Sequence, residues 1–234
     1  MPVRSTTPKK PKKDKKKKIL KHNTSFEKNL SISSRRYLER QARDPYVNMA
    51  QQRGYRSRAV FKLEEIDQKY KILKAGQHIV DLGAAPGGWS QYAGRRLTGQ
   101  CTVVALDLLP IDPIDHVTIL QGDFTEDAAE QALLALCPGG VDVVLSDMAP
   151  SVSGQAGVDH LRVMHLVELA HDFALKKLNS GGSFVCKIFM GGEEKKFAQI
   201  LRQDFTHVHF FKPKASRAES REMFLVALGF KGKS

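Results

Sequence analysis

The 234-residue chain has few cysteines and no long apolar run. Its cysteines, Cys101, Cys137 and Cys186, are odd in number and far apart, so they form neither a disulfide framework nor a zinc motif. No stretch reaches the roughly 18 apolar residues that cross a membrane, and no apolar segment follows the basic start. We therefore expect a cytoplasmic protein with reduced thiols, no membrane partner and no bound metal.

Three common ligand-binding motifs are also missing. The G-x-G-x-x-G turn of dinucleotide enzymes is absent, because Gly83 is followed by Ala85 and the next glycines are Gly87 and Gly88. The stretch from Gly88 to Tyr92 lacks the last glycine of the G-x-S-x-G elbow, and there is no P-loop. These absences argue against an NAD-dependent oxidoreductase, a nucleophilic hydrolase and a P-loop nucleotidase.

Positive charge is what the chain has in excess, and all of the excess lies near its start. The net charge is +12, with +9 in residues 1–24, +6 in residues 25–62 and −3 in the remainder. The lysine run predicts a disordered polybasic tail over 1–24, which favours nucleic acid over a membrane surface because no amphipathic apolar face accompanies it. Arginines interleaved with tyrosines predict a basic RNA-binding extension over 25–55; a solvated amphipathic helix is the alternative.

From residue 56 onward the pattern is that of an α/β domain. Ala59, Val60, Leu63 and Ile66 recur at helical spacing and predict a helix over 57–70. Further strands are expected at 78–82, 101–107, 116–120, 141–146 and 182–189, and helices near 88–97, 125–136, 160–178 and 192–203.

The last two apolar runs, 208–211 and 223–228, leave no room for a crossover helix, so they should pair antiparallel. We therefore predict a Rossmann-like α/β domain over 56–234, with a seven-stranded, mostly parallel sheet closed by an antiparallel hairpin. Such an ending suggests a methyltransferase. The ligand is expected at the carboxyl ends of the strands.

Chemistry-bearing residues stand where the predicted strands end. Small residues follow the apolar run Ile79–Leu82 and let the backbone approach an adenosine-type cofactor closely. Asp107 ends the next strand, where an acid can accept hydrogen bonds from both ribose hydroxyls. Asp123, Asp147 and Lys187 follow or end later strands. Each could instead be an N-cap or a solvated loop residue, but a lysine after a buried strand needs a partner for its charge.

Four segments together resemble the FtsJ/RrmJ family of RNA ribose 2′-O-methyltransferases, a likeness that runs from about Arg35 to Gly229. They are the sequences RSRAVFKL at 56–63, DLGAAPGGWS at 81–90, SDMAP at 146–150 and SRAESRE at 216–222. The resemblance implies a catalytic tetrad of Lys62, Asp147, Lys187 and Glu222. It also implies an S-adenosylmethionine pocket lined by Gly83, Gly87, Trp89, Asp107, Asp123 and Asp147.

The residue types suit this chemistry, because a ribose hydroxyl is a poor nucleophile that needs an adjacent base. Lys187 would be that base, and a second ammonium at Lys62 would favour loss of its proton by like-charge repulsion. Lys62 could equally bind a phosphate or orient the hydroxyl. Asp147 would hold Lys187 near the sulfonium, and Glu222 would fix a lysine or the hydroxyl.

Basic residues near these motifs are the expected RNA contacts, although an exposed hairpin turn would also explain the last four. They are Arg56, Arg58, Lys212, Lys214, Arg217 and Arg221. The resemblance implies methylation of a uridine ribose 2′-hydroxyl in 23S ribosomal RNA, on the assembled large ribosomal subunit, by a monomer. A methyltransferase of tRNA or another RNA and a non-catalytic RNA-binding assembly factor are the alternatives.

Overall fold

The computed structural model describes residues 43–150 and 155–232. The predicted tail and most of the predicted basic extension lie outside these residues, and the domain boundaries after 24 and 55 stay predictions. The chain divides into two compact units, Met1–Pro45 and Tyr46–Ser234, and the account below concerns the second. Within the described residues, no helix combines the length and the apolar character needed to cross a membrane.

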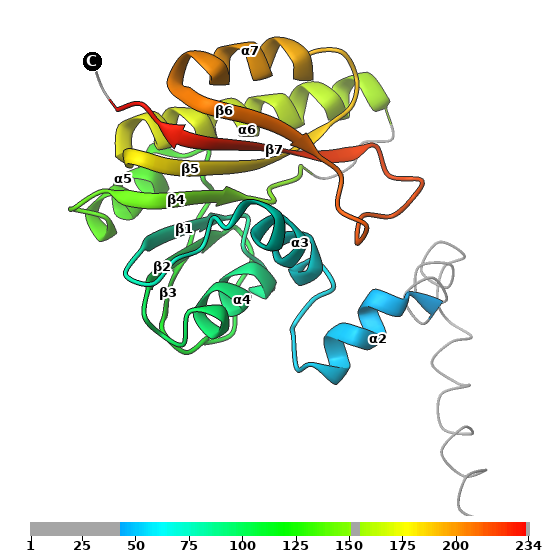
Figure 1. Cartoon of the computed structure of the whole chain (residues 1–234), viewed down its shortest axis with the longest axis vertical. Helices are drawn as coiled ribbons and strands as arrows, with labels where there is room; N and C mark the ends of the chain where they lie inside the picture. The colour runs from blue at the N-terminus through cyan, green and yellow to red at the C-terminus, as the bar shows by residue number, and fades with distance from the viewer. Residues whose placement is uncertain (1–42, 151–154, 233–234) are drawn as a thin grey trace, which may run out of the picture. The chain divides into compact units, whose positions relative to one another are not determined.

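A seven-stranded sheet forms the centre of this unit (Figure 1), with the strand order β3-β2-β1-β4-β5-β7-β6. Its strands are β1 His78–Leu82, β2 Thr102–Asp107, β3 Val117–Gln121, β4 Val141–Ser146, β5 Leu178–Phe189, β6 Phe205–Phe211 and β7 Glu222–Phe230. Neighbouring strands from β3 to β5 pair in parallel, whereas β7 runs antiparallel to both β5 and β6. The predicted fold class is therefore confirmed.

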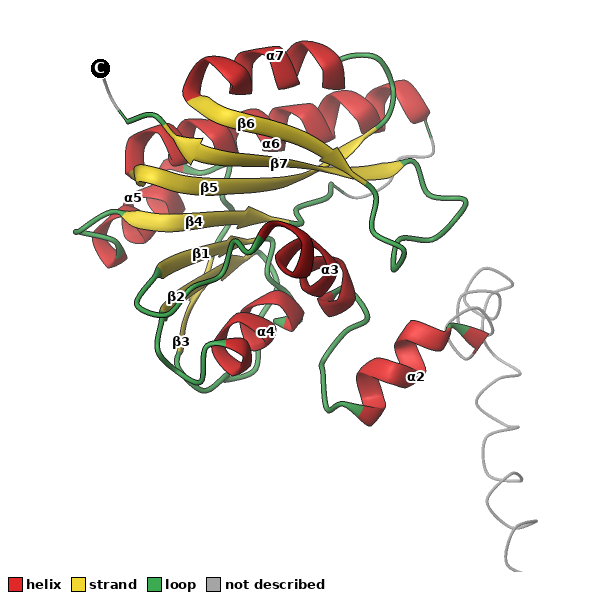
Figure 2. Ribbon diagram, in the orientation of Figure 1, coloured by secondary structure: helices red, strands yellow, loops and turns green. Residues whose placement is uncertain are grey.

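Helices pack on both faces of the sheet (Figure 2). They are α3 Val60–Tyr70, α4 Gly88–Arg96, α5 Asp127–Leu136, α6 Ala156–Lys177 and α7 Glu194–Asp204, whereas the short helix α2 Pro45–Gln52 does not lie on a face of the sheet. Because side chains alternate along a strand, Ile79 packs with the core beneath α3 and α4, while Val80 and Leu82 pack with the core beneath α5, α6 and α7. Two apolar cores thus hold the sheet from either side.

The predicted elements agree with the structure apart from two main differences. Helix α2 lies where a solvated amphipathic helix was only the alternative, and its Ala50 is buried in the core beneath α3. Strand β5 begins at Leu178 rather than at 182, because Leu178 pairs with Val141 and the register shifts before Val143. The polar and glycine residues after Leu178 look like a loop in the sequence, and they lie in the register shift between the Leu178–Val141 and Ser183–Val143 pairs.

The strand order creates a site between β1 and β4 where a ligand can bind. Strand β1 lies between β2 and β4, so the chain crosses over in opposite directions on its two sides. Ligands of doubly wound sheets bind outside the carboxyl ends of the strands at such a switch point. The backbone N–H of Asp147, directly after β4, donates to the carbonyl of Leu82 at the end of β1 over 3.2 Å. Asp147 is thereby fixed at this switch point.

Candidate active site

Four ionisable side chains from four separate elements meet beside the switch point. The Nζ atom of Lys62, on α3, lies 3.0 Å from a carboxylate oxygen of Glu222 at the start of β7 and 3.6 Å from Asp147. Lys187 of β5 lies with its Nζ atom 2.9 Å from the other oxygen of Asp147, and it also donates to the Asp147 backbone carbonyl. Lysines and carboxylates therefore alternate in one connected cluster.

The cluster is mostly shielded from water, which strengthens its ion pairs. The exposed fractions of the Lys62, Asp147, Lys187 and Glu222 side chains are 13%, 16%, 8% and 14%. Burial by itself raises the pKa of Asp147, but the ammonium groups of Lys187 and Lys62 outweigh it, so its pKa lies below the ordinary value. Asp147 is thus a carboxylate held between two cations.

Two residues outside the predicted set support this cluster. The hydroxyl of Ser216 donates to Glu222 over 2.8 Å. Glu65, one turn after Lys62 on α3, accepts hydrogen bonds from the backbone N–H groups of Lys214 and Ala215 over 2.6 and 2.8 Å. Ser216 belongs to a motif segment that the sequence reading quoted, but nothing in the sequence distinguishes Glu65. Together they hold the loop between β6 and β7 against the helix that carries Lys62.

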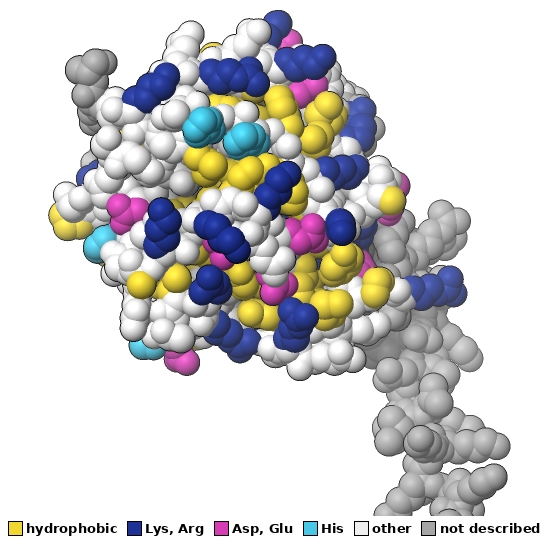
Figure 3. All heavy atoms as spheres, viewed as in Figure 1, with side chains coloured by type: hydrophobic (Ala, Val, Ile, Leu, Met, Phe, Trp, Pro, Cys, Tyr) yellow, Lys and Arg dark blue, Asp and Glu magenta, His cyan; other side chains and the backbone are white. Residues whose placement is uncertain are grey.

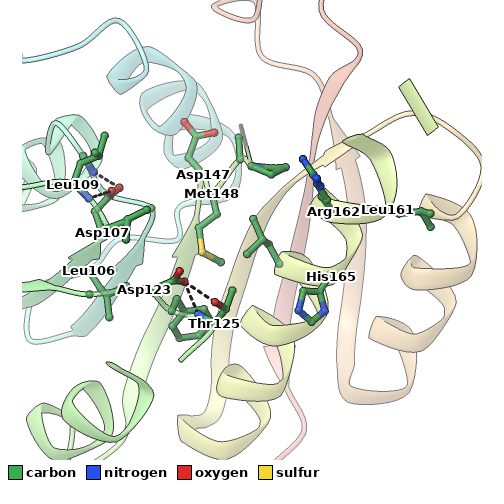
Figure 4. A pocket seen from close by; sticks show the side chains of 18 residues that line it. Leu106, Asp107, Leu109, Asp123, Thr125, Asp147, Met148, Leu161, Arg162 and His165 are labelled. Carbon is green, nitrogen blue, oxygen red and sulfur yellow. Dashed lines mark hydrogen bonds between the residues drawn. The ribbon is translucent and has the colours of Figure 1, made fainter. Parts of the chain in front are cut away.

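A cavity of about 690 Å³ opens next to the cluster, and Asp147 lines it as well (Figure 4). Of the predicted cofactor residues, Gly83, Asp107 and Asp123 also line this cavity. In Figure 4, Asp107 and Asp123 lie on one side and Arg162 and His165 of α6 on the other. Arg162 and His165, which line the cavity from α6, were not predicted, because no sequence motif marks them.

The other two cavity carboxylates, Asp107 and Asp123, are fixed by hydrogen bonds from neighbouring loops. Asp107 accepts hydrogen bonds from the backbone N–H groups of Ala85 and Leu109, each over 2.8 Å. Asp123 accepts from the hydroxyl and the backbone N–H of Thr125 over 2.7 and 2.9 Å, and these bonds lower its pKa below the ordinary value. Both side chains are therefore preorganised as hydrogen-bond acceptors.

Gly83, directly after β1, has to be a glycine because the backbone of Met148 passes close to it. Gly83 has a φ of +74°, and a Cβ atom there would lie 2.7 to 2.9 Å from atoms of Met148. Any side chain would therefore push the segment after β4 away from β1. The absence of a side chain at Gly83 lets the two strand ends form one wall of the cavity.

Two further predicted cofactor residues lie elsewhere. Gly87, at a φ of +100°, packs against the side chain of Ile114 and is not among the cavity-lining residues. Trp89 is 3% exposed, and its indole N–H donates to the carbonyl of Ala59 over 2.8 Å. Its ring lies 5.7 Å from that of Phe224, so Trp89 joins α4 to the core around Lys62.

The predicted RNA-binding residues divide into two groups. Arg56 donates to the carbonyls of Asp112 and Pro113, and Arg58 donates to the carbonyl of Ala215, so both guanidinium groups make contacts within the protein. In the loop between β6 and β7, Lys212, Lys214 and Arg221 are exposed and Arg217 is partly exposed. Only this second group combines exposure with closeness in sequence to Glu222.

The sheet order, the antiparallel β7 and a cavity at the switch point define a Rossmann-like methyltransferase fold. The chain belongs to the FtsJ-like methyltransferase family, whose model matches residues 55–230. Ribosomal RNA large subunit methyltransferase E from Acidiphilium cryptum is 50% identical over 199 residues, which cover 85% of this chain and 88% of that protein. The same-named protein of Brucella ovis is 50% identical over 204 residues, covering 86% and 85%.

The fold likeness extends to solved structures. One described as a ribosomal RNA methyltransferase, from Plasmodium falciparum, matches with a TM-score of 0.70 and 32% identity. The match covers 76% of this chain and 100% of that one.

Proposed function

We propose that this protein transfers a methyl group from S-adenosylmethionine to the 2′-hydroxyl of a uridine ribose in 23S ribosomal RNA, within the assembled large ribosomal subunit. The family supports methyl transfer, and relatives that cover most of the chain are named for the large-subunit RNA. One observation carries the proposal: Asp147 belongs both to the cavity wall and to the lysine–carboxylate cluster. A cofactor site and a proton-handling site therefore share one residue.

The cavity suits an adenosine-type cofactor in size and in chemistry. Its lining is largely apolar, with Leu106, Phe124 and Met148 beside the fixed acceptors Asp107 and Asp123. Asp107 and Asp123 would accept hydrogen bonds from cofactor hydroxyl and amino groups, and the carboxylate of Asp147 would favour a positive sulfonium. When bound, S-adenosylmethionine supplies an electrophilic methyl group, so the protein must supply a nucleophile and a proton acceptor.

The lysine–carboxylate cluster supplies the proton acceptor. In the proposed step, the ribose 2′-oxygen would form a bond to the methyl carbon while the bond from that carbon to the sulfonium sulfur breaks, leaving its electron pair on a neutral thioether. The hydroxyl proton would pass to Nζ of Lys187, which must enter the step as a neutral amine. Asp147 holds that Nζ atom through an ion pair with one carboxylate oxygen and a hydrogen bond to its backbone carbonyl. Lys62, positioned by Glu222, places a second positive charge beside Asp147.

The basic groups around the cluster would bring the RNA to it. The exposed lysines and arginines of the β6–β7 loop would contact phosphates and fix the register of the target nucleotide. The lysine-rich residues 1–24 would add affinity that depends strongly on salt and carries no sequence information.

The decisive experiment combines the purified protein, radiolabelled S-adenosylmethionine and large subunits from cells that lack this gene. We expect one ribose 2′-O-methyl group per subunit, mapped as an alkali-resistant linkage at a uridine. Lys187→Ala should lower the turnover rate roughly 10²- to 10⁴-fold, because a general base is lost. Lys196→Ala is the matched control, since Lys196 is 73% exposed and its ion pair is with the exposed Glu193, just before the same helix.

Three results would contradict the proposal in different ways. Label in tRNA but not in large subunits would move the activity to another RNA. No label in any RNA with the wild-type protein would indicate a non-catalytic binding factor. Unchanged turnover in Lys187→Ala would remove the base assignment while leaving the methyltransferase activity in place.

A further inference from the structure

The edge strand β6 presents a row of aromatic rings to solvent. Side chains at alternate positions of a strand share one face, so His207, His209 and Phe211 lie together, while Val208 and Phe210 pack into the opposite core. His207 and His209 are exposed, and their rings stack with centroids 6.2 Å apart and planes 19° from parallel. The sheet is therefore left partly uncovered at this edge.

Helix α3 continues this row with an aromatic ring and a cation. Tyr70 stacks on His209 with centroids 5.1 Å apart, and its ring meets Phe211 edge-on at 5.8 Å. The exposed Lys69 lies over both rings, with Nζ 5.1 Å from the Tyr70 centroid and 4.9 Å from the Phe211 centroid. We call Lys69, Tyr70, His207, His209 and Phe211 the β6 ring patch. Figure 3 shows histidine, hydrophobic and basic side chains side by side over this part of the molecule.

The β6 ring patch lies at a short, defined distance from the catalytic cluster. Lys69 follows Lys62 by seven residues, which is two helical turns on the same side of α3, or about 10 Å. Along the sheet, His209 pairs with Val226, four residues and about 13 Å from Glu222 on β7. Both routes place the patch within a few nucleotide lengths of the ribose that would be methylated.

We propose that the β6 ring patch is a stacking platform for unpaired bases of the RNA substrate that flank the target nucleotide. An open sheet face bearing aromatic rings suits single-stranded RNA, since every base offers a flat face to stack on. The Lys69 ammonium complements a neighbouring phosphate. The inference rests on RNA being the substrate and adds a binding surface beyond the cluster, the cavity and the β6–β7 loop.

The test separates ring stacking from histidine chemistry by comparing two double variants. His207→Ala with His209→Ala removes both rings, whereas His207→Phe with His209→Phe keeps flat rings without their nitrogens. His78→Ala is the matched control, because His78 is also an exposed histidine on a strand. It is the first residue of β1 and does not belong to the β6 ring patch. The probe is a uridine 12-mer carrying one 2-aminopurine, whose fluorescence falls when the base stacks.

We expect the double alanine variant to lose most of the fluorescence quenching and to bind the 12-mer roughly tenfold more weakly. The double phenylalanine variant and His78→Ala should stay within about twofold of the wild type. With large subunits, the double alanine variant should raise KM while leaving kcat and S-adenosylmethionine affinity unchanged. That pattern supports a positioning surface rather than a change in the catalytic cluster.

Several results would overturn the stacking proposal. Unchanged quenching in the double alanine variant would do so, and so would equal loss in the alanine and phenylalanine variants. A raised KM for subunits without a change in 12-mer affinity would assign the patch to a ribosomal protein instead. A wild-type protein that binds the 12-mer but methylates no subunit would refute only the proposed function, because the binding comparison does not depend on turnover.

Discussion

Asp81 and Asp147 lie at the ends of two paired strands, β1 and β4, yet their surroundings hold them in different charge states. Asp81 is 1% exposed, and burial raises its pKa to about 7, with the Ser90 hydroxyl 2.7 Å away as the main opposing contact. Asp147 is also buried, but its pKa is lowered because two ammonium groups outweigh the burial. The difference shows that neighbouring charge, rather than depth, decides whether a carboxyl group here stays ionised.

The two carboxyl groups suit different tasks. Asp147, ionised at neutral pH because its pKa is lowered, holds two lysines together. Asp81, which the sequence reading did not single out, lies one strand away and fixes Ser90 at the start of α4, directly behind the turn at Gly83. The negative charge of Asp147 is in turn one of the causes that raise the pKa of Asp81. The ionisation of Asp81 is therefore coupled to the charge of Asp147.

Asp147→Asn should have the largest effect of the changes that test this difference between Asp81 and Asp147. This change leaves the ammonium groups of Lys62 and Lys187 facing each other without the carboxylate between them. We expect an almost complete loss of methyl transfer and a fall in the free energy of unfolding of roughly 3 kcal/mol or more, because breaking a buried ion pair strands its partner charges. Urea denaturation at pH 7 measures the second effect.

Asp142→Asn provides the matched control for that variant. Asp142 accepts hydrogen bonds from the His78 backbone N–H and from Asn179 over 2.8 and 3.0 Å. An asparagine can still accept one of these bonds, so a loss near 1 kcal/mol is expected. Equal losses in the two variants would show that Asp147 contributes no more than an ordinary hydrogen-bonded acid.

A second prediction uses the sign of the Asp81 shift. Its pKa is about 7 in the folded protein against 3.8 for the unperturbed group, so the folded state binds the extra proton between these values. The free energy of unfolding should therefore fall as pH rises through this window, by at most about 1.4 kcal/mol per pH unit. Asp81→Asn cannot lose that proton and should gain roughly 2 kcal/mol relative to the wild type between pH 5 and pH 7.

The measurement is the difference in free energy of unfolding between the two proteins across that pH range, in which the shared titrating groups cancel. Asp147 should show the opposite linkage, since its stabilising charge is present above the ordinary aspartate pKa and is lost as pH falls below it. A difference between wild type and Asp81→Asn that does not vary from pH 5 to pH 7 would contradict the raised pKa.

Most helices and strands could be predicted from the sequence, because the spacing of apolar residues within each one is visible in a few consecutive positions. Apolar runs that stop at a charged or small residue predicted β1 and β4 to the residue. Helix α2 was only an alternative in the sequence, because its burial depends on tertiary contacts such as that of Tyr46 with Phe61. Arg58, expected at the RNA, donates to a carbonyl 157 residues away. Such partners depend on the tertiary fold, and no spacing in the sequence specifies them.

The residues of the candidate site also fall into those that the sequence predicts and those whose surroundings depend on the tertiary fold. Residue types at strand ends and the family motifs predicted the four cluster residues, which the structure brings together, and their catalytic roles stay predictions. Trp89 was expected at the cofactor but packs in the core, since an aromatic ring after a glycine turn can face either the ligand or the helix behind it. Asp81 was missed because its importance lies in what surrounds it: a buried place beside Ser90 and near Asp147.

The smallest change sharpens the comparison by removing the larger of the two contacts that help Asp81 ionise, the hydroxyl of Ser90, while the backbone contact of Ser90 stays. Ser90→Ala removes the hydroxyl, which should move the pKa of Asp81 further above its ordinary value and extend the pH window over which stability falls. Because a hydrogen bond to an ionised group is stronger than one to a neutral group, the loss of stability should be about 1 kcal/mol at pH 5 and about 2 kcal/mol at pH 8. Unfolding free energies of Ser90→Ala, alone and combined with Asp81→Asn, measure this. In the Asp81→Asn background the loss should be the same at both pH values, and a loss that still grows with pH there would mean that Ser90 acts on another titrating group.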